Sequence, residues 1–113
     1  MSKHDPNIAF NQLLSHAQEA VEILRGKTRS DLDTDRLLNL ALTRLLEIIG
    51  EAANRVPDEI QIKYPDIPWL QMISARNRLI HGYDNVDFDI LWIIVKDDLP
   101  ALISQIEKIL KDK

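Results

Sequence analysis

The chain has 113 residues, no cysteine, 45% hydrophobic residues and a formal net charge of −4. These values are typical of one ordinary globular domain, which we expect to span residues 1–113, and they exclude disulfides and thiolate metal sites. The acidic balance argues against a general nucleic-acid-binding face, so any RNA contact would be local. No apolar run is long enough to span a membrane, and the amino terminus lacks the apolar core of a signal peptide, so we expect a cytoplasmic protein without a membrane partner.

The first expected helix opens at Asp5 and Pro6, which are typical of an N-cap and a first helical residue. Apolar residues then recur at helical spacing, and Gly26 follows them as a residue that can end a helix in the left-handed conformation.

A second long helix is expected after a polar connection, with Asp31 and Asp33 as candidate caps. Its broad apolar stripe consists of Leu37, Leu38, Ala41, Leu45, Ile48, Ile49, Ala52 and Val56. Beside the stripe, Arg44, Glu47 and Glu51 follow one another at spacings of three and four. Two interpretations stay open for this polar ridge: it is an ordinary solvated charge ladder, or Glu47 or Glu51 crosses to a cation on another helix.

Three prolines punctuate the next segment, and a short helix from Asp58 to Tyr64 fits between them. A further helix is expected from Trp69 to His81, with Gly82 to end it. On a helical wheel, Arg76 falls within the apolar face of this helix, whereas Arg78 falls on the opposite, solvated face. A guanidinium in an apolar face is costly unless it is paired, so we expect Arg76 to meet a carboxylate of the polar ridge.

The last helix is expected to start at its N-cap, Asp87, and to carry a regular apolar seam from Phe88 to Ile109. Pro100 should kink this helix, because proline has no N–H to donate to the carbonyl four residues earlier. Extra apolar residues within 90–95 suggest a partner subunit. The pattern as a whole predicts an all-α fold, an antiparallel bundle of four main helices plus one short helix.

The segment from Ser74 to Tyr83 gathers two arginines, an asparagine, a histidine and a tyrosine in ten residues. Taken singly, a buried arginine is usually part of an ion pair and a histidine near a helix end is usually a cap. Together, Arg76-x4-His81 followed by x-Tyr83 resembles the signature of HEPN-domain proteins, more narrowly of the HepT-like toxins that are paired with minimal nucleotidyltransferase antitoxins. The flanking segments 35–38, 44–55, 67–69 and 89–100 are similar to that subfamily as well.

This resemblance implies the HEPN fold, a homodimer and a metal-independent endoribonuclease that acts on tRNA or mRNA, with no cofactor. Arg76 would hold the phosphate and stabilise the transition state, and His81 would act as acid or base. Asn77 and Arg78 would make supporting contacts to the RNA phosphate. Since one histidine is too few for separate acid and base groups, a two-fold dimer would bring two Arg76/His81 sets together.

In the HepT-like subfamily the partner nucleotidyltransferase transfers AMP to the motif tyrosine and silences the toxin, which implies Tyr83 as the modified residue here. A cognate minimal nucleotidyltransferase antitoxin would then be the protein partner. The acidic charge and the single motif histidine leave room for a different interpretation, a non-catalytic helical module that binds a nucleotidyltransferase partner or a nucleotide. A purely structural four-helix dimer would leave Arg76 unexplained.

Overall fold

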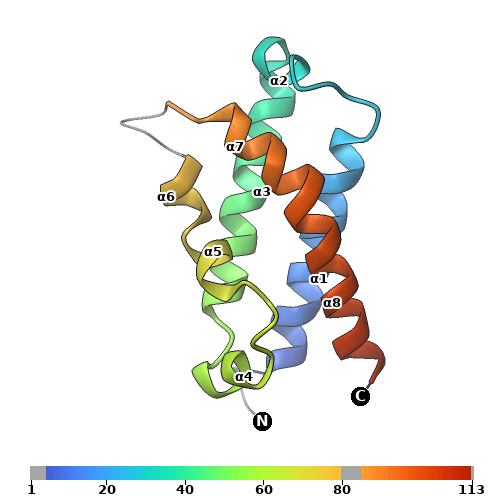
Figure 1. Ribbon diagram of the computed structural model, residues 1–113, viewed down its shortest axis with the longest axis vertical. Coiled ribbons are helices and arrows are strands. Elements are labelled where there is room, and N and C mark those ends of the chain that lie inside the picture. The colour runs from blue at the N-terminus through green and yellow to red at the C-terminus, as the bar shows by residue number, and fades with distance from the viewer. Residues whose placement is uncertain (1–4, 80–84, 113) are drawn as a thin grey trace.

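The structure is a computed structural model that describes residues 5–79 and 85–112 (Figure 1). Helices provide all the regular elements of these residues, and no β-strand occurs in the two ranges. The expected all-α class is therefore confirmed. None of the helices in the described residues is long and apolar enough to cross a membrane.

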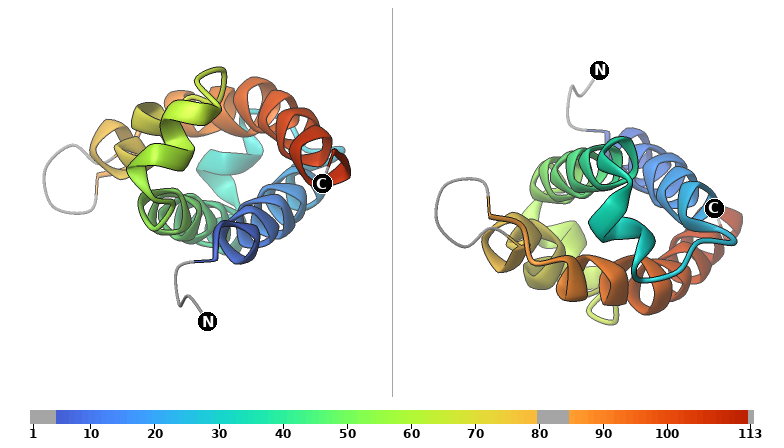
Figure 2. Two further views of the ribbon diagram at one scale, coloured as in Figure 1. Left: turned by 90° about the horizontal axis from the view of Figure 1, so that it is seen from below. Right: turned by 90° about the horizontal axis from the view of Figure 1, so that it is seen from above.

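Four helical stretches run alternately up and down the molecule in Figure 1. In chain order the helices are α1 (Pro6–Leu24), α2 (Asp31–Thr34), α3 (Arg36–Asn54), α4 (Asp58–Lys63), α5 (Trp69–Ile73), α6 (Ala75–Leu79), α7 (Phe88–Ile93), the π-helical segment η1 (Ile94–Asp98) and α8 (Leu99–Lys111). The end-on views of Figure 2 show α1, α3, the pair α5–α6 and the run α7–η1–α8 around a common axis. The antiparallel order agrees with expectation, but two short helices stand where a fourth long one was predicted.

The helix starts follow local capping, with one departure from the predicted residues. The Asp5 side chain accepts a hydrogen bond from the backbone N–H of Asn7, and Gly26 has a φ of 78°, as expected. The caps predicted at Asp31 and Asp33 were wrong for the second long helix. Residues 31–34 form a separate turn, and the Asp35 side chain caps α3 instead.

Pro100 is accommodated by a wider helical turn directly before it. Asp87 caps α7 as predicted, with its carboxylate accepting from two backbone N–H groups. The chain then widens into η1, where the Leu99 N–H donates to the carbonyl of Ile94, five residues back. A π-turn removes the conflict between the proline ring and the preceding carbonyl, so the helix continues into α8.

A single apolar core joins the helices, and within it α3 and α5 approach each other closely at Gly50. A Cβ atom built on Gly50 would lie 2.8 Å from the carbonyl oxygen of Met72 and 3.5 Å from that of Ile73. Only glycine leaves room for this approach of the two backbones. The turn before α5 is anchored on α1, since the Phe10 ring meets Tyr64 edge-on at 5.8 Å and Trp69 at 6.1 Å between ring centroids.

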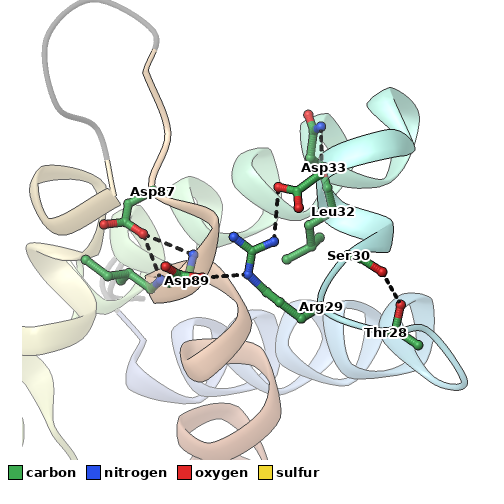
Figure 3. A network of polar contacts seen from close by, with 9 residues as sticks. Thr28, Arg29, Ser30, Leu32, Asp33, Asp87 and Asp89 are labelled. Carbon is green, nitrogen blue, oxygen red and sulfur yellow. Dashed lines mark hydrogen bonds and ion pairs between the residues drawn. The ribbon is translucent and has the colours of Figure 1, made fainter.

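Arg29 links the α1–α2 connection to the start of α7 through an ion pair (Figure 3). Its Nε lies 2.7 Å from an Asp89 carboxylate oxygen, and its Nη1 lies 3.1 Å from Asp33. Hydrogen bonds to these two carboxylates, that to Asp89 first, raise the pKa of Arg29 above its ordinary value. Nearby, the backbone N–H of Asp87 donates to the Leu79 carbonyl at 2.7 Å, which ties the start of α7 to the end of α6.

Gly50→Ala should lower the free energy of unfolding by about 1–3 kcal/mol, because the new methyl group would collide with the backbone of α5 and force α3 and α5 apart. The loss should exceed the gain of up to about 1 kcal/mol that alanine brings to a helix interior. Denaturant unfolding would measure the change, with Glu51→Ala, at the exposed neighbouring position, as the control expected to change little. Gly50→Ala as stable as the native protein would contradict the close approach.

Candidate functional site

The helix predicted from Trp69 to His81 is broken at Ser74 within the described residues. α5 ends at Ile73 and α6 starts at Ala75, while Ser74 has φ −94° and ψ 7°. The Ser74 hydroxyl donates to the carbonyl of Leu70 at 2.6 Å, alongside the Ser74 backbone N–H at 2.9 Å. Such back-bonding by serine competes with regular helical geometry and bends the chain.

The break reverses the expected environments of the two arginines. Arg76 was predicted inside the apolar face, but its side chain is 68% exposed. Arg78 was predicted on the solvated face, but it is half-buried and borders an apolar recess that includes Met72 and Leu99. Both predictions were wrong because they carried one regular wheel across Ser74, where α5 has ended and α6 has not yet begun.

Arg76 is nevertheless held by a carboxylate of the polar ridge on α3. Its Nε lies 3.1 Å from Oε2 of Glu47, whose side chain is only 24% exposed. The other oxygen of Glu47, Oε1, lies 3.8 Å from Nη1 of Arg44, and the same nitrogen lies 3.4 Å from Glu51. Both interpretations of the ridge therefore hold in part, since it forms a charge ladder along α3 and Glu47 also crosses to α6.

A hollow of about 250 Å³ lies beside this ion pair, between α3 and the pair α5–α6. Its lining residues are Leu46, Glu47, Gly50, Glu51, Asn54, Ile73 and Arg76. Gly50 lines the hollow and lies against the backbone of α5. Because it has no side chain, it does not fill this space. The hollow thus offers an apolar floor, two carboxylates, an amide and one guanidinium to a bound molecule.

The remaining predicted site residues are divided between different surfaces. Asn77 is exposed and follows Arg76 on α6, whereas Arg78 borders the recess described above rather than the hollow. His81 and Tyr83 lie outside the described residues.

The described part of the site presents the guanidinium of Arg76 at the surface. No group of three or more histidine, aspartate or glutamate side chains in residues 5–79 and 85–112 is arranged to hold a metal ion. Within the same ranges, Glu47 is the ion-pair partner of Arg76, and their contact is through Nε. The terminal nitrogens of an arginine form a fork that binds a phosphate through two parallel hydrogen bonds.

Gly50 is the residue of this site that the sequence reasoning missed. A glycine in the middle of a strongly apolar helix costs about 1 kcal/mol relative to alanine, so its presence in α3 was a signal of close backbone contact.

Comparison with known proteins gives a consistent family assignment. The family model described as "Ribonuclease HepT-like" matches residues 13–109. "Probable ribonuclease HepT" of Thermococcus cleftensis is 39% identical over 102 residues, covering 87% of this chain and 93% of that protein. "Putative RNase MJ1380" of Methanocaldococcus jannaschii is 34% identical over 107 residues, covering 95% of this chain and 98% of the relative. No solved structure gives a significant match.

Arg76→Ala should change the free energy of unfolding by less than about 0.5 kcal/mol, because an exposed ion pair contributes little to stability. Arg29→Ala is the matched control: Arg29 is 33% exposed and joins two carboxylates, so its loss should cost about 1 kcal/mol. Denaturant unfolding of both variants would check this. An Arg76→Ala protein destabilised more than Arg29→Ala would mean that Arg76 has a mainly structural role.

Proposed function

Because the chain belongs to the HepT-like ribonuclease family, we propose that it is a metal-independent endoribonuclease with Arg76 and His81 as its catalytic residues. The observation that supports this proposal most strongly is the exposure of Arg76 and its contact with Glu47. The side chain is oriented through Nε by Glu47, and Arg76 has no other ion-pair partner within the described residues.

The proposed reaction is attack of a 2′-hydroxyl on the adjacent phosphorus. Arg76 binds the phosphate and stabilises the charge that develops on its oxygens. His81 transfers a proton as acid or base near neutral pH. Asn77 is proposed to contact the same phosphate or the 2′-hydroxyl. Arg78 borders a different recess, so its proposed contact is to a phosphate farther along the RNA.

We also propose that two copies of the chain form the active dimer, which would bring two Arg76/His81 sets together. The apolar run of residues 90–95 supports this dimer less than expected, because Leu91, Ile94 and Val95 are buried in the core of their own chain. Exposed apolar side chains at Ile93 and Leu70, 49% and 77% exposed, are better candidates for such an interface.

The biological role that we propose is that of a toxin controlled by a partner. A cognate minimal nucleotidyltransferase would act as antitoxin and transfer AMP to Tyr83. The added phosphate and adenosine would place negative charge and bulk two residues from His81, where an RNA phosphate could no longer bind.

Purified protein should cleave cellular RNA in the presence of EDTA and leave ends with a cyclic 2′,3′-phosphate. Arg76→Ala and His81→Ala should each lower the cleavage rate by about 100-fold or more, as expected for loss of a transition-state donor or a proton-transfer group. Arg25→Ala removes an exposed arginine at the end of α1 that is paired with Glu22, and it is the control expected to keep full activity. RNA left intact by the native protein would favour the non-catalytic binding module, and cleavage abolished by EDTA would contradict metal independence.

Tyr83→Phe should abolish AMP transfer by the cognate nucleotidyltransferase, since the acceptor hydroxyl is gone, and should leave RNA cleavage intact. The chain has two tyrosines, so Tyr64→Phe is the matched control and should still gain the mass of one AMP group. Intact-protein mass spectrometry and a cleavage assay on both variants would test this. Loss of cleavage in Tyr83→Phe would indicate that the phenol is catalytic or structural.

A further inference from the structure

Glu47 differs from the other charged residues of the α3 ridge. Its side chain is 24% exposed, whereas Arg44, Glu51 and Arg76 are 62%, 56% and 68% exposed. It is also shared between two arginines, with Oε2 at 3.1 Å from Arg76 and Oε1 at 3.8 Å from Arg44. The longer distance exceeds that of a hydrogen bond, so Oε1 accepts no hydrogen bond from the described residues, and Glu47 lines the hollow.

A phosphate on the terminal nitrogens of Arg76 would bring a 2′-hydroxyl close to this oxygen. The guanidinium is planar and rigid, so a ligand on its terminal nitrogens has a fixed position relative to the carboxylate on Nε. In the reactive conformation the 2′-oxygen lies about 3 Å from the phosphorus it attacks. The hydroxyl and the phosphate would then lie near Glu47, which lines the same hollow as Arg76.

We propose that Glu47 is the general base of the cleavage reaction, an inference that rests on the proposed function. The Glu47 carboxylate takes the proton of the 2′-hydroxyl as its oxygen forms a bond to phosphorus. The bond from phosphorus to the 5′-oxygen breaks, and the leaving oxygen takes a proton from the acid of the proposed reaction. The products are a cyclic 2′,3′-phosphate and a 5′-hydroxyl, and proton exchange with water restores both groups.

Glu47→Gln removes the proton-accepting carboxylate but keeps a side chain of the same size beside Arg76. The amide of glutamine cannot take up a proton at working pH. Glu22→Gln is the matched control, because Glu22 is an exposed glutamate of α1 whose ion pair is with Arg25. The experiment is single-turnover cleavage of one RNA by both variants, together with binding of the same RNA with its 2′-hydroxyls methylated.

Glu47→Gln should cleave at least about 100-fold more slowly than the native protein while binding the methylated RNA with similar affinity. Glu22→Gln should keep the cleavage rate and the RNA affinity of the native protein.

Two results would overturn the assignment in distinguishable ways. If the native protein cleaves and Glu47→Gln matches Glu22→Gln in rate, Glu47 is not the base and the proposed function stands. If the native protein cleaves no RNA, the proposed function fails and the assignment fails with it.

Discussion

The close approach of α3 and α5 at Gly50 is the constraint on which the rest of the site depends. With no side chain at Gly50, the carbonyl of Met72 comes within 2.8 Å of where a Cβ would be. That approach brings α5 and the following α6 against the polar ridge of α3, and so brings Arg76 to Glu47. A larger residue would separate the helices and widen the hollow whose wall they share.

The break at Ser74 then decides which arginine faces the solvent. A continuous helix would have turned Arg76 toward the core and Arg78 toward water. The bend exposes Arg76 beside the hollow and directs Arg78 into an apolar recess. An exposed arginine oriented by a less exposed carboxylate is suited to bind a phosphate, because the carboxylate contacts Nε and Arg76 has no other ion-pair partner within the described residues. The charges of Arg44, Glu47, Glu51 and Arg76 cancel, which limits attraction of RNA to this local contact.

The helix caps could be predicted from neighbouring residues in the sequence, whereas the directions of the two arginines at the site could not. Asp5, Gly26 and Asp87 cap or end helices as predicted, because capping involves only neighbouring residues. The family resemblance of the Arg76–Tyr83 segment was likewise confirmed by the match over residues 13–109.

The failures have a common cause, in that helix continuity was assumed from apolar spacing alone. Spacing does not indicate that the Ser74 hydroxyl competes for a backbone carbonyl four residues earlier. It also placed Leu37 in the apolar stripe, although this residue is 80% exposed at the start of α3. A helical wheel represents neither hydrogen bonds from side chains to the backbone nor the packing between helices.

The central claim is that the exposed Arg76 fork binds an RNA phosphate, and NMR of the arginine side chains tests it most directly. Titration with an RNA whose 2′-hydroxyls are methylated would prevent cleavage and leave the phosphates intact. The account predicts that the guanidinium signals of Arg76 shift and saturate, whereas those of Arg25, on the exposed end of α1, stay nearly constant. Unchanged Arg76 signals while other residues respond to the RNA would contradict it.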